Sequence, residues 1–230
     1  MEWVEQIEAI LFDMDGTLID TDDQAVARLA GRLRPFLAAR AQSTARWLLM
    51  QAETPGNVLV TLLDMVGLDE PLMGFTDRLR RRRGVYAAPE FRLIPGVAEM
   101  LQLVNGRYRL GIVTTRSRYH IDRFLEQFPD IAPLFEVTCG LQDTRRLKPH
   151  PAPIRKAAQQ LGLPPEKCLM VGDTTVDIRS ARRAGAQSVG VLCGFGEQRE
   201  LERVGADVVL PSTADLAQLL RSGEISTSTE

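Results

Sequence analysis

The stretch AILFDMDGTLID, from Ala9 to Asp20, decides how the fold is interpreted. Its first four residues are apolar, which is typical of a central strand that is covered on both faces. Two aspartates, Asp13 and Asp15, end this strand, and Asp15 is followed by a glycine and a threonine. An Asp-Gly turn explains Asp15 but leaves Asp13 without a role. Because a buried carboxylate is costly without a partner, we interpret both acids as groups that face a cation and take part in chemistry.

Strands and helices alternate along the chain from Leu93 onward. The sequence predicts strands at 109–115, 135–140, 167–173, 187–194 and 206–211. It predicts helices at 94–104, 117–128, 150–163, 174–185, 197–205 and 212–220. Strands that alternate with helices of about 10–15 residues form right-handed βαβ units. We therefore expect an α/β fold in which helices cover both faces of an open parallel sheet.

Residues 20–93 interrupt this alternation, because they contain several helical patterns and no clear strand. We expect them to form a helical cap, inserted after the first strand of an α/β catalytic core that comprises residues 1–19 and 94–221. The segment AAPEFRLIPG, at 87–96, contains prolines and a glycine that suit a hinge. The polar residues 222–230 are expected to form a disordered tail.

The composition is that of an ordinary soluble globular protein. Of the 230 residues, 44% are hydrophobic and 25% are charged, and the net charge is -2. This balance favours neither nucleic acid nor a membrane surface as a partner. No apolar stretch approaches the roughly 20 residues of a membrane span, and we expect the first residues not to act as a signal peptide. The three cysteines lack the spacing of a zinc site or a disulfide framework, so we expect a cytoplasmic protein.

Polar side chains gather where three of the predicted strands end, and a lysine precedes one of the predicted helices. In chain order these candidates are Asp13, Asp15, Thr114, Thr115, Lys148, Asp173 and Asp177. In open α/β sheets ligands bind beyond the carboxyl ends of the strands, so we expect these residues to converge. Clustered carboxylates repel one another without a cation. Hard oxygen ligands select Mg²⁺, which commonly takes a phosphate as a further ligand.

Four short motifs, in their order and spacing, resemble those of the haloacid dehalogenase superfamily. They are DMDGT, VTT, KPHP and GDTTVD. The helical insert lies at the cap position of the phosphoglycolate-phosphatase-like branch of that superfamily, and the resemblance spans about residues 7–221. It implies a Mg²⁺-dependent phosphatase that acts on a small phosphorylated metabolite through an aspartyl-phosphate. A monomer or homodimer is the expected state.

The resemblance implies that Asp13 is the nucleophile that attacks phosphorus. It implies that Asp15 protonates the leaving oxygen and then activates water. Two residues of a strand that are separated by two share a face, which agrees with a nucleophile and its proton partner. Gly16, which follows Asp15, would let the backbone amides turn towards the phosphate group of the substrate.

The resemblance assigns the remaining candidates to the phosphoryl group and the metal. Thr114 and Lys148 would hold the phosphoryl oxygens, and the positive charge of Lys148 would reduce their repulsion of an approaching carboxylate. Thr115 is a further substrate-binding candidate. The implied metal ligands are the Asp13 carboxylate, the Asp15 backbone carbonyl and the Asp173 carboxylate. Asp177 would support the metal directly or through water.

Several chemistries share this scaffold. Dehalogenases of the superfamily lack the second aspartate, and Asp15 is present. The phosphonate-cleaving branch uses a cap lysine, and the first lysine of this chain is Lys148. A phosphatase and a phosphomutase of the β-phosphoglucomutase type remain, as does a pyrophosphatase. Similarity of the C-terminal stretch to phosphoglycolate phosphatases favours hydrolysis of a small monoester.

The substrate stays open at this point. Thr115 and Arg116 replace the asparagine and lysine that are usual in the second motif of the branch, so sugar phosphates, nucleoside monophosphates and pyrophosphate remain alternatives. The run Arg80–Arg83 points in several directions on a helix, and we expect a solvated basic face rather than a substrate clamp. A non-catalytic interaction module would have lost the nucleophile or a metal ligand, and this chain keeps them all.

Overall fold

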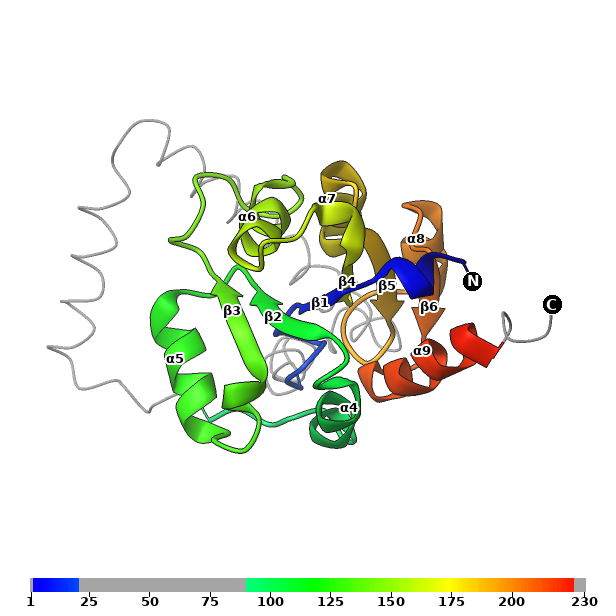
Figure 1. The fold of residues 1–230 in the computed structure, drawn as a ribbon. Helices are drawn as coiled ribbons and strands as arrows, with labels where there is room; N and C mark the ends of the chain where they lie inside the picture. Colours follow the sequence, from blue (N-terminus) through cyan, green and yellow to red (C-terminus); the bar gives the residue numbers. More distant parts are fainter. Residues whose placement is uncertain (1, 21–89, 226–230) are drawn as a thin grey trace, which may run out of the picture. The chain divides into compact units, whose positions relative to one another are not determined.

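The computed structural model describes residues 2–20 and 90–225. Within them, six parallel strands form one sheet in the order β3-β2-β1-β4-β5-β6 (Figure 1). The strands are β1 (Ala9–Phe12), β2 (Arg109–Val113), β3 (Phe135–Cys139), β4 (Cys168–Gly172), β5 (Gln187–Val191) and β6 (Val208–Leu210). The expected α/β class with an open parallel sheet is confirmed.

All six helices that we predicted after residue 93 are present. They are α4 (Val97–Val104), α5 (Arg118–Gln127), α6 (Ala152–Gln160), α7 (Thr175–Ala184), α8 (Gln198–Arg203) and α9 (Leu216–Ile225). Short 3-10 turns add η1 (Glu2–Gln6), η3 (Ala132–Leu134), η4 (Pro165–Lys167) and η5 (Thr213–Asp215). In the described ranges, no helix has the length and apolar character that crossing a membrane requires.

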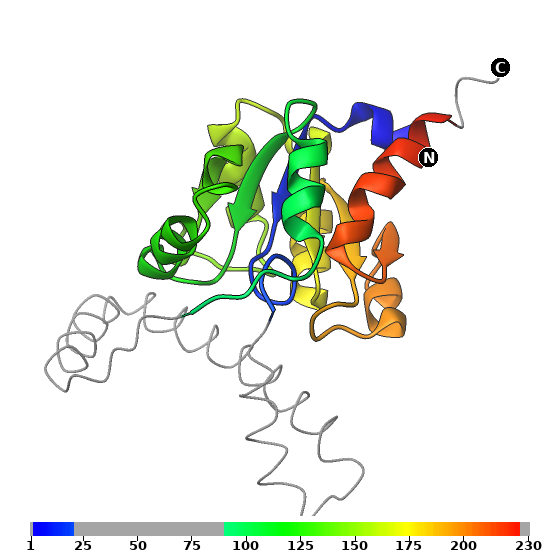
Figure 2. The same cartoon turned by 90° about the horizontal axis from the view of Figure 1, so that it is seen from below.

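Strand β1 divides the core into two layers because its alternate side chains point to opposite faces. Ile10 and Phe12 join a cluster that contains buried side chains of α4, α5 and α9. Ala9 and Leu11 join a second cluster, which contains buried side chains of α6 and α7. The ribbon shows these two groups of helices on opposite faces of the sheet (Figure 1), with α4 and α9 side by side in front of it in Figure 2.

The register of the central strands aligns their carboxyl ends. Phe12, the last residue of β1, pairs with Ile112 on one side and with Val171 on the other. Each of the three strands is therefore followed by its polar residues at the same edge of the sheet. This alignment explains why side chains that are far apart in the sequence meet there.

Two expectations concern the ends of the core. The chain divides into two units, residues 1–21 with 91–230 and residues 22–90, and almost all of the second unit lies outside the described residues. The predicted helical cap and the Arg80–Arg83 run therefore lie outside them too.

The predicted tail begins too early, because α9 continues to Ile225. Arg221 and Ser222 each donate from their side chain to the carbonyl four residues before, Ala217 and Gln218.

Candidate active site

Asp13 lies directly after β1 and is held by its backbone and its side chain. Its N–H donates to the Val171 carbonyl at 2.9 Å, so it continues the pairing of β1 with β4. Its Oδ1 lies 2.9 Å from Nζ of Lys148, whose side chain is only 4% exposed. Lys148 also donates to the Val113 carbonyl at the end of β2. The backbone of β2 therefore helps to fix the lysine beside the predicted nucleophile.

Two further carboxylates lie beside Asp13. The cluster consists of three buried residues, Asp13, Asp173 and Asp177. Each contributes one carboxylate oxygen, and these three oxygens lie within 4.8 Å of one another. Asp177 is engaged on both oxygens. Oδ1 pairs with Lys148 at 2.6 Å, and Oδ2 accepts from the backbone and hydroxyl of Thr174 at the start of α7. Asp177 thus completes the capping box of α7 and is also a partner of the lysine.

The charge of this cluster has consequences for its ionisation. Burial, together with the nearby Asp177 and Asp15, raises the pKa of Asp13 to about 7, although Lys148 acts in the opposite direction. Burial lowers the pKa of Lys148, but Asp13 and Asp177 outweigh it and leave that pKa above its ordinary value. With all groups ionised, three carboxylates and one ammonium leave a buried charge of about minus two, which a divalent cation would balance.

Three glycines allow the backbone to approach Asp173 closely. Gly16 has a φ of +66°, and a Cβ there would lie 2.3 Å from Asp173 Oδ2. A Cβ on Gly194 would lie 2.0 Å from the same oxygen, and one on Gly196 would lie 2.0 Å from the Asp173 carbonyl. The N–H of Phe195, between the latter two, donates to Asp173 Oδ2 at 2.7 Å. The loop after β5 therefore fixes this carboxylate. Sequence analysis missed it, although two glycines separated by one residue after a strand were a signal.

The two predicted threonines differ in their surroundings. Thr114 follows β2, is 3% exposed, and its Oγ1 accepts from the N–H of Arg116 at 3.2 Å. Thr115 is half-buried. Of the two hydroxyls, that of Thr114 thus lies in the buried part of the site.

Asp15 has a partner that sequence analysis had noted but not assigned. Nε and Nη2 of Arg116 donate to Oδ2 and Oδ1 of Asp15 at 2.7 and 2.6 Å. The two side chains are 22% and 30% exposed, for Asp15 and Arg116 respectively. The guanidinium also lies over the ring of Phe91, at 5.3 Å from its centroid. In the sequence, the signal for Arg116 was that an arginine replaces the lysine that is usual in the second motif.

Cys139 and Cys168 are not suited to nucleophilic chemistry. Burial raises the pKa of Cys139 and of Cys168 to about 11, so both thiols stay protonated near neutral pH. Cys193 is half-buried, and its Sγ lies 3.3 Å from the Gly16 carbonyl. All three are free thiols, as the sequence predicts.

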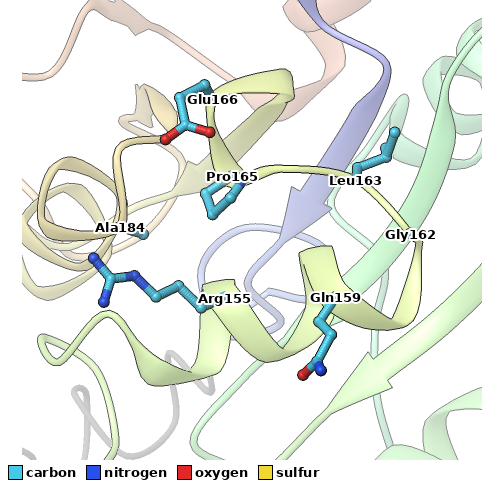
Figure 3. A pocket seen from close by; sticks show the side chains of 7 residues that line it. All are labelled: Arg155, Gln159, Gly162, Leu163, Pro165, Glu166 and Ala184. Atoms are coloured by element: carbon cyan, nitrogen blue, oxygen red, sulfur yellow. The ribbon is translucent and has the colours of Figure 1, made fainter.

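A hollow of about 620 Å³ lies away from these carboxylates (Figure 3). It is formed by α6, by the turn that leads into β4, and by the end of α7. The turn η4 precedes β4, whereas Asp173 follows it, so the hollow lies at the opposite edge of the sheet. Its lining residues are Arg155, Gln159, Gly162, Leu163, Pro165, Glu166 and Ala184. None of the predicted site residues contributes to it.

The chain is similar to several known proteins. The family model described as haloacid dehalogenase-like hydrolase matches residues 10–191. Phosphoglycolate phosphatase of Escherichia coli (strain K12) is 29% identical, with 96% of this chain and 95% of that protein covered. The crystal structure of a CbbY variant from Rhodobacter sphaeroides with xylulose-(1,5)bisphosphate is 25% identical, with a TM-score of 0.64 over 91% of this chain and 96% of that one. A putative β-phosphoglucomutase from Bacteroides vulgatus, at 19% identity and a TM-score of 0.67 over 94% and 89%, shares the fold.

Proposed function

Because the chain belongs to the haloacid dehalogenase-like hydrolase family and is similar to phosphoglycolate phosphatases, we propose that it hydrolyses a small phosphate monoester with Mg²⁺ through a phosphorylated Asp13. The substrate would resemble phosphoglycolate, which the name of the E. coli relative contains. One observation carries the proposal: Asp13 directly follows β1, with the Lys148 ammonium at 2.9 Å and two carboxylates beside it. As part of the same proposal, the protein is a cytoplasmic monomer or homodimer.

In the first step, the Asp13 carboxylate attacks phosphorus and the bond from phosphorus to the leaving oxygen breaks. A carboxylate and a phosphate dianion repel each other, so positive charge beside both is required. The Lys148 ammonium lies close enough to Asp13 to contact phosphoryl oxygens that approach this carboxylate. The hydroxyl of Thr114, buried beside the end of β2, would donate to another of these oxygens, and Thr115 would assist at the rim.

Proton transfer belongs to Asp15 in this proposal. It gives a proton to the leaving oxygen as the first step proceeds. It then takes a proton from the water that attacks phosphorus in the second step, which releases phosphate and regenerates Asp13. The position of Asp15 supports this role, because it lies two residues beyond the nucleophile at the same edge of the sheet.

The donor set fits a divalent cation. All the donors are oxygens, which favours Mg²⁺ over the softer transition metals. Asp13, Asp173 and the Asp15 backbone carbonyl would hold the ion, and Asp177 would support it. When bound, Mg²⁺ would neutralise charge on the phosphoryl oxygens and on the attacking carboxylate.

A phosphomutase of the β-phosphoglucomutase type is the second candidate, because proteins with that description share the fold. Both reactions would use the same core residues and differ in whether water reaches the phosphorylated aspartate. The products separate them. A phosphatase releases phosphate in step with substrate loss, whereas a mutase forms an isomeric phosphate ester and requires a bisphosphate activator.

A panel of small phosphate compounds tests the proposal. Phosphoglycolate, sugar phosphates, nucleoside monophosphates and pyrophosphate are each incubated with the full chain and Mg²⁺, and released phosphate is measured. We expect stoichiometric release from at least one monoester and loss of activity with EDTA. An isomerised ester as the main product would favour the mutase, and release from pyrophosphate alone would favour a pyrophosphatase.

A further inference from the structure

Asp15 is held in a way that the proposed reaction does not by itself explain. Both of its carboxylate oxygens accept from Arg116, which comes from the segment after β2, 101 residues along the chain. A side chain engaged in this manner must be released before it can contact a leaving oxygen. The pair is partly exposed, with 22% and 30% of the two side chains accessible, so a small solute can reach it.

The guanidinium of Arg116 is oriented by a packed support. It lies over the Phe91 ring at 5.3 Å from the ring centroid, and this arrangement fixes the plane of the guanidinium with its fork of two N–H donors. Phe91 is itself held by Gln127, whose side-chain amide accepts from the Phe91 N–H at 2.9 Å and donates to its carbonyl at 2.6 Å. The ring also packs edge-on against Phe124 in the core. Such a fixed fork matches the two oxygens of a carboxylate or phosphate.

We propose that Arg116 binds a second anionic group on the leaving-group side of the substrate, a carboxylate or a phosphate. This inference rests on the proposed function, in which Asp15 contacts the leaving oxygen. If Asp15 contacts that oxygen, the leaving-group atoms bonded to the oxygen lie next to Arg116, which holds Asp15. The Asp15 carboxylate already occupies the fork in the geometry that a substrate carboxylate would adopt.

Binding and catalysis are coupled by an exchange of partners. The anionic group of the substrate replaces Asp15 as the acceptor of the Arg116 hydrogen bonds. The Asp15 side chain can then turn towards the leaving oxygen. An ester with a neutral leaving group provides no such anion and leaves Asp15 bound to Arg116. Arg116 therefore selects phosphate monoesters that carry a second negative group within a few bonds of the ester oxygen.

A matched pair of esters tests this selection. Phosphoglycolate carries a carboxylate, and 2-hydroxyethyl phosphate has nearly the same size with a hydroxyl instead. We expect the wild type to prefer phosphoglycolate in kcat/KM by at least about tenfold, because paired charges bind more strongly than neutral groups. Arg116→Gln should remove most of this preference. Arg118→Gln is the control, because Arg118 pairs with Thr138 and Asp143 instead, and it should keep the preference.

Binding without turnover separates this inference from the proposed function. In an Asp13→Asn background, calorimetry with and without Mg²⁺ gives the affinity for each of the two esters. Adding Arg116→Gln should weaken phosphoglycolate at least about tenfold more than 2-hydroxyethyl phosphate. If the wild type releases phosphate from no monoester of the panel but this binding difference is found, the proposed function fails and the role of Arg116 in anion binding stands. Equal weakening of both esters, or no wild-type preference in binding, would overturn the role of Arg116 in recognition.

Discussion

Lys148 and Asp177 form an ion pair of 2.6 Å in which the two side chains are 4% and 0% exposed. The pair joins the segment before α6 to the first turn of α7. Asp177 also accepts from the N–H and the hydroxyl of Thr174, which caps α7. A single side chain thus stabilises a helix start and fixes the lysine that lies beside the predicted nucleophile.

Substitution of Asp177 separates these two effects. Asp177→Asn removes the negative charge but keeps an acceptor for Thr174. We expect it to lower the free energy of unfolding by about 2–4 kcal/mol, because it leaves the buried lysine less well compensated. Asp177→Ala also removes the cap and should cost about 1 kcal/mol more. Denaturant titration followed by circular dichroism measures both losses.

A similar capping box without the lysine is the control for this prediction. Asp215 accepts from the N–H of Ser212 at the start of η5, and it forms no salt bridge among residues 2–20 and 90–225. Asp215→Asn should therefore cost less than about 1 kcal/mol. Similar losses for Asp177→Asn and Asp215→Asn would contradict a stabilising role for the buried pair.

The nucleophile is tested by Asp13→Asn. An amide cannot form the phosphorylated intermediate, so released phosphate should fall by at least about 10³-fold. Asp130→Asn changes an exposed acid and should keep wild-type activity. Circular dichroism checks that both variants fold. Activity retained by Asp13→Asn would exclude Asp13 as the nucleophile.

The raised pKa of Asp13 predicts a pH dependence of stability for the metal-free protein. Between pH 3.8 and about 7, the folded protein keeps a proton on Asp13 that the unfolded chain has released. The free energy of unfolding should therefore fall as the pH rises through this window. The raised pKa of Lys148 does not contribute here, because it acts only above the ordinary lysine value of 10.5.

Comparison with Asp13→Asn isolates this contribution, because other titrating groups cancel. The asparagine of the variant does not titrate, so only the wild type loses stability as the pH rises. The free energy of unfolding of the variant, relative to wild type, should therefore increase between pH 4 and 7 by on the order of a few kcal/mol. Urea denaturation with EDTA, repeated across this range, gives the difference. A constant difference would show that Asp13 titrates at its ordinary pKa in the folded protein.

The close approach of Gly194 to Asp173 predicts an effect on metal affinity. Gly194→Ala places a methyl group where only 2.0 Å separates it from Asp173 Oδ2, so the carboxylate or the loop must move. We expect Mg²⁺ to bind at least about tenfold more weakly, because a ligand carboxylate must be held in place. Calorimetric titration of Mg²⁺ measures this loss.

Gly106→Ala is the matched control for the glycine loop. Gly106 has a φ of +83°, but a Cβ there meets nothing within 4 Å. This variant should lose about 1 kcal/mol of stability through backbone strain and keep its Mg²⁺ affinity. Weaker Mg²⁺ binding in both variants would point to general destabilisation rather than to the position of Asp173.

The sequence by itself determined the order of strands and helices and the candidates at the strand ends. This was possible because burial periodicity is a local property: the apolar run before Asp13 and the alternation after Leu93 each reflect neighbouring residues. The parallel sheet follows from that alternation, and its carboxyl edge follows from strand direction. The predicted helix 174–185 ends at Gly185, and the structure closes α7 at this residue in the left-handed conformation that glycine favours.

Only the tertiary structure decided which partner each of these side chains has. Arg116 and Asp15 lie 101 residues apart, and Phe195 and Asp173 lie 22 apart, so no local pattern connects them. Asp177 could not be identified as the partner of Lys148 for the same reason. Such pairings depend on strand register and on how closely two loops approach, which the whole sheet and its packed helices set together. The sequence therefore determined which residues meet at this edge, and the packed fold decided which of them bind one another.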